Sequence, residues 1–201
     1  QIDLLELVRQ LINDSRRLFI THHVYPRITT DGGEEPGAPD SVKPGAPAGE
    51  DPTGEDPTGE DPTGDDTWCS VVSDRKWLRF ILEQVLHNAV KYSSTKEEEP
   101  PGLVTFSCRR DQSGEVILTI ADNGIGIEAE DLGRVFSPFY TGIHGRSYPG
   151  STGMGLYLAQ RAARQLGHRL HLESAPGRGT KVHLHFPAAP TIFSGLKVTT
   201  K

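Results

Sequence analysis

Residues 75–93 read RKWLRFILEQVLHNAVKYS, an uninterrupted run without glycine or proline. Asp74 precedes the run and is of a type that caps helix N-termini, so the run predicts one long helix. Residues four apart share a face of a helix. The polar residues of one such face are Gln84, Asn88, Lys91, Tyr92 and Thr95. The rest of the helix is mostly apolar and therefore buried, so this polar stripe is expected either to line a cavity or to face solvent.

Short segments of alternating apolar and polar residues surround this helix and predict strands. They cover residues 24–30, 68–73, 103–109, 115–121, 169–174 and 180–186. The spacing of apolar residues predicts two further helices, over residues 3–21 and 156–166. Pro26 indicates that the segment at 24–30 is an edge strand. The order of elements predicts an α/β (α+β) two-layer sandwich, in which about three helices cover one face of a mixed β-sheet.

The chain of 201 residues is expected to form one domain over residues 1–187, followed by a tail at 188–201. Residues 31–66 interrupt the domain with 8 Gly, 7 Pro and 12 acidic residues, including three copies of Gly-Glu-Asp-Pro-Thr. This composition predicts a disordered insert, because it cannot bury enough apolar surface to fold. We expect it in the turn between the strands at 24–30 and 68–73, where added length costs little entropy. Its net charge is −11, so the remaining residues carry +5 within a total of −6.

The chain is expected to be a cytoplasmic fragment of a longer protein. It begins at Gln1, its only methionine is Met154, and no run approaches the ~20 apolar residues of a membrane span. No signal peptide opens the sequence. Cys69 and Cys108 fall in expected strands, and we expect reduced thiols rather than a disulfide.

A carboxylate and two glycines follow an apolar strand in Asp122-Asn123-Gly124-Ile125-Gly126-Ile127. Glycines let a ligand approach the backbone closely. A carboxylate accepts hydrogen bonds from an exocyclic amine such as that of adenine. On its own, the pattern is more often an ordinary turn at a strand end.

Two later segments carry further signals of a ligand site. Residues 136–140 (FSPFY) are typical of an anchor for a mobile loop, here residues 140–150 with the cation Arg146, or else of a local hydrophobic plug. Residues 150–156 (GSTGMGL) open a helix, where backbone N–H groups and the helix dipole favour a polyphosphate. They match neither the P-loop nor GxGxxG, and their alternative is an ordinary glycine-rich turn.

The order of these four segments resembles that in the GHKL (Bergerat) ATP-binding superfamily. Within it, the chain is similar to the catalytic and ATP-binding domain of bacterial sensor histidine kinases. The similar segments are LEQVLHNAVKYS (82–93, N box), DNGIGI (122–127, G1 box), FSPFYTG (136–142, F box), STGMGL (151–156, G2 box) and the closing hairpin SAPGRGTKVHLHFP (174–187). The form EQxxxNAxKY with STGMGLYLA is most similar to the BceS-like kinases, which sense peptide antibiotics alongside an ABC transporter.

The resemblance implies the Bergerat fold, ATP and Mg²⁺ as cofactors, and a role for each matching residue. Asn88 would coordinate the Mg²⁺ that bridges the phosphates, with Gln84 as a second amide ligand. Lys91 and Tyr92 would lie near phosphate and sugar, and Asp122 would accept from adenine N6. The other implied cofactor-binding residues are Gly124, Gly126, Ile127, Phe136, Phe139, Gly153, Met154, Gly155, Leu156 and Thr180.

The catalytic residues are expected to be Asn88, Lys91 and Arg146. Arg146 matches no motif and is included because its charge and position let it meet the γ-phosphate. ATP-hydrolysing relatives have a glutamate at the position of Gln84, and Glu83 points about 140° away from Asn88 around the helix. Phosphoryl transfer needs mainly positioning and charge neutralisation, so transfer to a protein nucleophile is expected rather than hydrolysis.

The resemblance implies an acceptor histidine followed by an acidic residue on a helical dimerisation domain. None of the histidines at 22, 23, 87, 144, 168, 171, 183 and 185 is followed by an acid, so that domain is expected upstream of Gln1. His87 is expected to point away from Asn88. The pairs 168/171 and 183/185 are expected to face solvent rather than bind zinc. Other implied partners are a response regulator and an ABC transporter in the parent's pathway, with the parent a homodimer in the cell (inner) membrane; no nucleic acid is expected.

Two alternatives to a histidine kinase remain open. The chain could be a GHKL serine kinase or ATPase, against which Gln84 argues, because it replaces the water-activating glutamate. It could also be a non-catalytic nucleotide-binding docking module, against which the presence of every motif argues.

Overall fold

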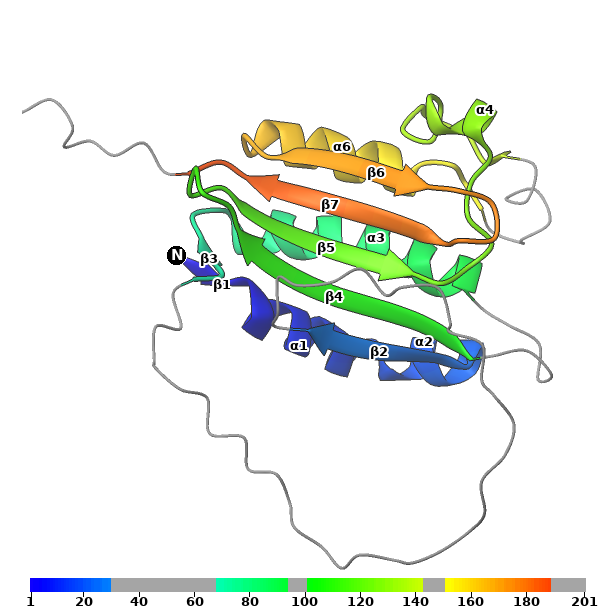
Figure 1. Cartoon of the computed structure of the whole chain (residues 1–201), viewed down its shortest axis with the longest axis horizontal. Coiled ribbons are helices and arrows are strands. Elements are labelled where there is room, and N and C mark those ends of the chain that lie inside the picture. The colour runs from blue at the N-terminus through cyan, green and yellow to red at the C-terminus, as the bar shows by residue number, and fades with distance from the viewer. Residues whose placement is uncertain (30–67, 94–100, 143–150, 189–201) are drawn as a thin grey trace, which may run out of the picture.

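The computed structural model describes residues 1–29, 68–93, 101–142 and 151–188 of the chain (Figure 1). The acidic insert at 31–66 lies outside these residues, as do Thr95, Arg146 and the tail beyond residue 188. The expectations for those parts of the chain therefore stay predictions.

Five strands form a mixed sheet in the order β2-β4-β5-β7-β6. They are β2 (Val24–Thr29), β4 (Gly102–Arg110), β5 (Val116–Asp122), β6 (Arg169–Ser174) and β7 (Thr180–Phe186). β2 runs parallel to β4, whereas every other neighbouring pair is antiparallel. The mixed sheet is confirmed, and β2 with its Pro26 lies at an edge as predicted.

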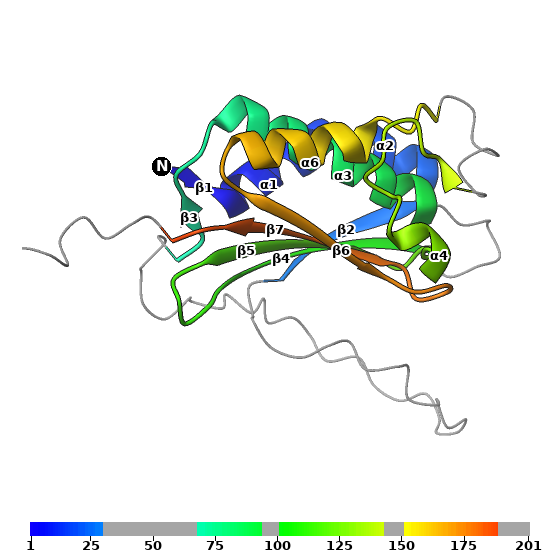
Figure 2. The same cartoon turned by 90° about the horizontal axis from the view of Figure 1, so that it is seen from above.

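The main helices lie on one face of this sheet (Figure 2). They are α1 (Leu4–Asp14), α2 (Arg16–His22), α3 (Arg75–Ser93) and α6 (Gly155–Gln165), whereas the short α4 (Ala129–Leu132) lies beside the β6 edge of the sheet. The capping prediction is right: Asp74 Oδ1 accepts from the N–H groups of Lys76 and Trp77 at 2.9 and 3.0 Å. Because the main helices form one layer on one face of the sheet, the predicted two-layer architecture is confirmed.

The helix predicted over residues 3–21 is two helices that meet at Ser15. The break falls on the run Asn13-Asp14-Ser15, and short polar side chains of this kind compete with helical backbone hydrogen bonds. The apolar periodicity continues across the break, which explains why it predicts a single helix.

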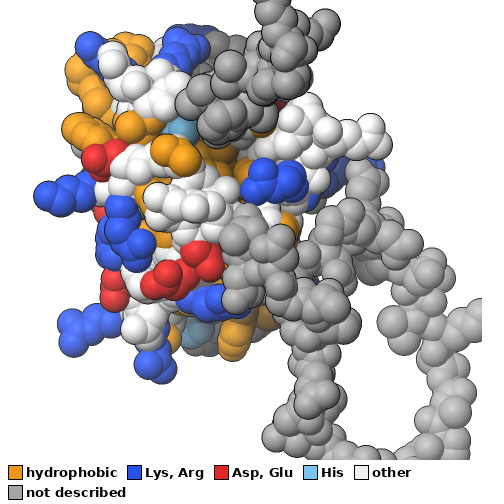
Figure 3. Space-filling model, turned by 90° about the vertical axis from the view of Figure 1, so that its left-hand side faces the viewer, with side chains coloured by type: hydrophobic (Ala, Val, Ile, Leu, Met, Phe, Trp, Pro, Cys, Tyr) orange, Lys and Arg blue, Asp and Glu red, His pale blue; other side chains and the backbone are white. Residues whose placement is uncertain are grey.

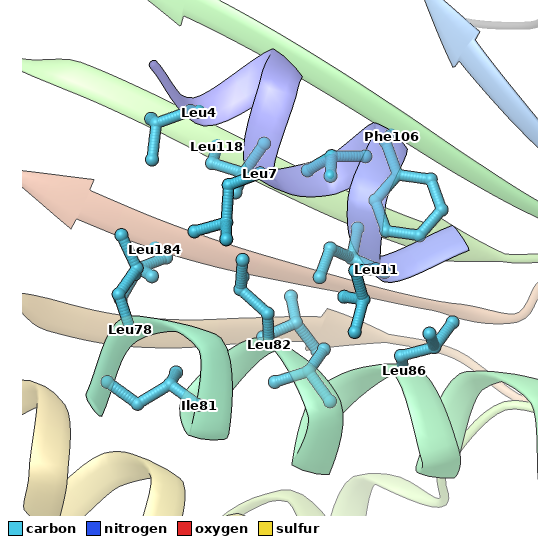
Figure 4. Packing of buried hydrophobic residues seen from close by; sticks show 14 of the residues in the cluster. Leu4, Leu7, Leu11, Leu78, Ile81, Leu82, Leu86, Phe106, Leu118 and Leu184 are labelled. Carbon is cyan, nitrogen blue, oxygen red and sulfur yellow. The ribbon is translucent and has the colours of Figure 1, made fainter. Parts of the chain in front are cut away.

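The core lies between α1, α3 and the helical face of the sheet (Figure 4). Leucines of α1 face leucines of α3, and Phe106, Leu118 and Leu184 cover them from the sheet. Eight residues of α3 are buried. This packing holds α3 in place and so positions its polar stripe.

A second, two-stranded sheet corrects the prediction for residues 68–73. β3 (Ser70–Val71) pairs antiparallel with β1 (Ile2–Asp3), and not with β2. The insert therefore does not extend a hairpin turn between paired strands. A long connection places few constraints on its two ends, so strands that neighbour each other in sequence can join different sheets.

Cys69 and Cys108 form a disulfide, so the expectation of two reduced thiols is wrong. Their Cα atoms are 6.3 Å apart, and both residues are buried. Cys69 directly precedes β3 and Cys108 lies in β4, so the bond ties the small sheet to the large one. The fold brings together residues 39 positions apart, which their spacing alone does not reveal.

The predicted ladder of solvent-facing histidines is only partly right. His171 is exposed, but His183 is partly covered and its Nδ1 lies 2.9 Å from Thr119 Oγ1. Burial lowers the pKa of His183. His168 is buried and bonds the hydroxyl of Ser73 at 2.8 Å. In the described part of the chain, no three histidine, cysteine or acidic residues form a group that could hold a metal.

The end of the molecule that carries β1 and β3 has a mixed surface. Charged side chains of both signs and apolar side chains are interspersed there (Figure 3). Among the described residues, no helix combines the length and apolar character needed to cross a bilayer.

Candidate active site

The polar stripe of α3 lines a cleft of about 330 Å³. The other walls come from the segment after β5, residues 135–142, the start of α6, and β6 and β7. Gln84, Asn88, Lys91 and Tyr92 line this cleft, and Asp122 lines it too. The stripe therefore does not simply face solvent, and the amide of Asn88 shares one cavity with the carboxylate of Asp122.

Asp122 stands at the end of β5, where its position is fixed by backbone groups. Its Oδ1 accepts from the N–H of Gly124 at 2.9 Å and of Thr180 at 3.2 Å. Burial raises the pKa of Asp122 to about 6, and the two hydrogen bonds oppose this shift. The group is therefore largely ionised at neutral pH. Because both bonds use Oδ1, Oδ2 is left to accept from a donor in the cleft.

Two glycines let the backbone close around Asp122. A Cβ on Gly124 would lie 2.3 Å from the carbonyl oxygen of Tyr92. A Cβ on Gly179, whose φ is +73°, would lie 1.9 Å from the carbonyl oxygen of Asp122. Any side chain at either position would push the strand end away from α3 or from β7. These close approaches bring Asp122 within the same cleft as the stripe of α3.

The opposite end of the cleft offers donors to an anion. Gly155 and Leu156 line it at the N-terminus of α6, and the capping residue Met154 makes no side-chain cap. The first N–H groups of a helix and its dipole attract negative charge. Lys91 lies nearby, donates to the hydroxyl of Ser151, and has a pKa lowered by burial. This end suits the phosphates of a nucleotide.

The side-chain amides of Gln84 and Asn88 lie beside the start of α6, where a divalent cation could bind together with the phosphates of a nucleotide. A Cβ on Gly155 would lie 3.0 Å from Gln84 Oε1 and 3.7 Å from Asn88 Nδ2, so both amides face the start of α6. Amide oxygens are hard donors, and Mg²⁺ commonly uses few protein ligands together with phosphates and water. The donor set therefore fits Mg²⁺.

The two phenylalanines of the F box do not line the cleft. Phe136 packs against the core, and Phe139 is 77% exposed with φ of +63°. Tyr140 lines the cleft in their place. Its hydroxyl bonds the carboxylate of Asp131, and the Arg134 guanidinium lies 4.4 Å from its ring centre.

Other predicted residues divide between the cleft and its surroundings. Gly126, Ile127, Gly153 and Thr180 line the cleft, whereas Gly124 and Met154 do not. Sequence patterns missed several further lining residues; apart from Tyr140, they include Glu128, Asp131, Thr141, Ser151 and Thr152. Ser151 and Thr152 lie within the G2 segment, so their place in that motif is a signal that could have found them.

Glu83 and His87, the chain neighbours of Gln84 and Asn88 on α3, border a second cleft. Glu83 pairs with Arg79 at 2.8 Å and borders a second cleft between α2 and α3. This position agrees with the helical angle and keeps Glu83 from the place of a hydrolytic base. His87, expected to point away from Asn88, is exposed and borders both clefts, so that expectation is only partly right.

The comparison with protein families agrees with this geometry. The model of the family described as histidine kinase-, DNA gyrase B-, and HSP90-like ATPase matches residues 73–190, more than half of the chain. The chain belongs to this family. The expected resemblance is confirmed, and nucleotide binding is the activity that this ATPase domain shares with its family.

Curated relatives of the ATPase domain are sensor kinases. The chain is 30% identical over 185 residues to the sensor histidine kinase YxdK of Bacillus subtilis, covering 92% of the chain and 45% of YxdK. It is 42% identical over 117 residues to the sensor protein BceS of Halalkalibacterium halodurans, covering 58% of the chain and 33% of BceS. The expected similarity to BceS-like kinases is confirmed. The chain spans less than half the length of these relatives.

Solved structures confirm the Bergerat fold of the ATPase domain. The nucleotide-free catalytic domain of histidine kinase ThkA superposes with a TM-score of 0.63 at 16% identity, covering 94% of the chain and 96% of ThkA's. The mycobacterial sensor histidine kinase MprB gives 0.60 at 22% identity, covering 94% and 97%. At these identities the likeness concerns the fold alone.

Proposed function

We propose that the ATPase domain binds Mg²⁺–ATP and transfers its γ-phosphate to a histidine on a separate dimerisation domain. The observation that carries the proposal is the shared cleft, which the Asp122 carboxylate, the Asn88 amide and the N-terminus of α6 all line. These groups match the two ends of a nucleoside triphosphate. A protein of the same fold, full-length ShkA, has been solved in complex with AMPPNP (TM-score 0.62, 19% identity, covering 94% of the chain and 32% of ShkA).

Each wall of the cleft has a role in this proposal. Asp122 accepts from the amino group of the base. Gln84 and Asn88 would hold Mg²⁺, which would supply positive charge beside the phosphates. Lys91 and the N–H groups at the start of α6 balance the remaining phosphate charge. Arg146, outside the described residues, is proposed to meet the γ-phosphate.

Transfer is proposed rather than hydrolysis, because the cleft has an amide at the position where hydrolytic relatives have a glutamate. The bond between the γ-phosphorus and the β,γ-bridging oxygen breaks, and a bond to an imidazole nitrogen forms as ADP leaves. The imidazole proton passes to solvent or to a base on the acceptor domain. Positioning and charge neutralisation are the main requirements of such a reaction.

The whole protein is proposed to be a homodimeric sensor kinase of the cell membrane with this domain on the cytoplasmic side. Its partners would be its own histidine-bearing domain and a response regulator. An ABC transporter in the same pathway is proposed from the BceS-like relatives.

The test is labelling of the full-length parent protein with [γ-³²P]ATP. We expect a phosphoprotein that is stable to alkali and labile to acid, as phosphohistidine is. Asn88→Ala should abolish labelling, whereas Glu83→Gln, on the other side of α3, should retain it. An acid-stable phosphoprotein would indicate a serine kinase, and release of free phosphate without a phosphoprotein would indicate an ATPase. Failure to bind ATP would indicate a docking module.

A further inference from the structure

Ser174, at the end of β6, lies just outside the cleft and connects three segments that form its wall. Its hydroxyl accepts from the backbone N–H of Ile127 at 2.9 Å. It donates to the carbonyl oxygen of Gly179 at 2.7 Å and lies 3.0 Å from the hydroxyl oxygen of Thr180. It thereby links the segment after β5 to the ends of β6 and β7. The sequence motifs assign it no role.

The three contacts of Ser174 fix the direction of a neighbouring proton. A serine hydroxyl has one proton to donate and two lone pairs with which to accept. The carbonyl of Gly179 can only accept, so it takes the proton of Ser174. In the remaining contact Ser174 must therefore accept, and the hydroxyl of Thr180 must donate to it.

The same reasoning determines what Thr180 offers to the cleft that it lines. Its hydroxyl proton points to Ser174, and its backbone N–H is bonded to Asp122 Oδ1 at 3.2 Å. Its oxygen is then left as an acceptor. Asp122, when ionised, is also only an acceptor. The end of the cleft formed by Asp122 and Thr180 thus presents acceptors and no side-chain donor.

We propose that Ser174 is a positioning residue that sets the base preference of the cleft. By holding the Thr180 hydroxyl as an acceptor, it favours a purine with an amino group at position 6 over one with a carbonyl group there. This inference rests on the proposed function, since it requires a nucleotide whose base lies at Asp122. A 6-carbonyl in that place would face acceptors only and lose its hydrogen bonds, and an unmatched buried polar group discriminates strongly between ligands.

The experiment compares ATP with inosine triphosphate, which carries the 6-carbonyl and is otherwise the same apart from the proton on N1. Affinities are measured by calorimetry with the full chain. Wild type should prefer ATP. Ser174→Ala should reduce the ratio of the two affinities about tenfold, because the freed Thr180 hydroxyl can turn and donate to the 6-carbonyl. Ser174→Thr, which keeps the hydroxyl, should retain the wild-type ratio.

Introducing Ser174→Ala into a Thr180→Val variant distinguishes orientation of the Thr180 hydroxyl from a purely structural role of Ser174. There, Ser174→Ala should leave the ratio unchanged, since no hydroxyl remains to be directed. Equal weakening of both nucleotides by Ser174→Ala would show a structural role only and overturn the inference. A wild type that binds both nucleotides equally would also overturn it and leave the proposed function standing. A wild type that binds neither would overturn the proposed function and this inference together.

Discussion

At the level of single residues, burial of the Asp122 carboxylate costs the folded domain stability at neutral pH. Desolvation disfavours the charged form, so burial raises its pKa from 3.8 to about 6. The unfolded chain releases this proton near pH 4 and the empty folded domain near pH 6. Stability is therefore lost as pH rises through this window, on the order of 3 kcal/mol at neutral pH. The cost is consistent with a carboxylate retained for binding.

Asp122→Asn should therefore have opposite effects on binding and on stability. It replaces an acceptor with an amide donor that faces the base, and should weaken ATP binding by roughly 1.5–3 kcal/mol. Unchanged affinity in calorimetry would refute the role of Asp122 in base recognition.

The same variant should stabilise the nucleotide-free domain at pH 7. Its amide oxygen can still accept from Gly124 and Thr180, but no charge is buried. The gain should be about 1–3 kcal/mol at pH 7 and fall to well under about 1 kcal/mol at pH 4, where the folded wild-type carboxyl is protonated and the unfolded one is about half protonated. Urea unfolding at both pH values measures it; a gain that grows on acidification would contradict the assignment.

The turn between β6 and β7 shows how a connection between strands shapes the site. Gly177 and Gly179 both adopt positive φ, of 69° and 73°. A Cβ at Gly179 would lie 1.9 Å from the carbonyl oxygen of Asp122, whereas one at Gly177 would meet nothing within 4 Å. Only Gly179 is required by close packing as well as by backbone conformation.

Gly177→Ala and Gly179→Ala form a matched pair. The first should cost about 1 kcal/mol, the usual penalty for a side chain in the left-handed region. The second should cost at least about 3 kcal/mol, because the clash adds to this penalty. It should also weaken ATP binding by displacing Asp122. Urea unfolding and calorimetry measure the two effects, and equal losses in both variants would show that the contact at Gly179 is relieved without strain.

The disulfide connects the two sheets of the molecule. Cys69 and Cys108 are 39 residues apart, so the bond closes a loop that the unfolded chain would otherwise leave open. In the chain-entropy description, a cross-link of this span contributes about 2–4 kcal/mol to stability. It joins the segment that follows the insert to a central strand of the large sheet.

Reduction of this bond should lower the stability of the domain by about 2–4 kcal/mol without removing the cleft. Thermal unfolding with and without reductant measures the change. A Cys69→Ala/Cys108→Ala variant is the control and should not respond to reductant. Two titratable thiols in the untreated, denatured protein, with no effect of reductant, would restore the original expectation of free cysteines.

Much of the local structure could be predicted from the chain. Residues 75–93 form one helix because they lack breakers and follow a capping aspartate. The segments at 103–109 and 115–121, and those at 169–174 and 180–186, form β4–β5 and β6–β7 within one or two residues. Hairpins of this kind depend on turns and alternation that lie within a few residues of each other.

The site was predictable to the extent that its residues belong to motifs. Gln84, Asn88 and Asp122 share a cleft as the order of motifs indicates. Phe136 and Phe139 do not line the cleft, and no sequence motif predicts the hydrogen bond between Tyr140 and Asp131. Such contacts depend on how loops fold back on each other, which residue types alone do not specify.

Residue order alone was sufficient for the family, the long buried helix and the sharing of one cleft by Gln84, Asn88 and Asp122, because these follow from short-range periodicity and local motifs. The parallel pairing of β2 with β4, the pairing of β1 with β3 and the bond between Cys69 and Cys108 became evident only in three dimensions. So did the direction of the Thr180 proton. Each joins residues distant in the chain, and which of the many available pairings forms depends on the packing of the whole domain, not on the preferences of its segments.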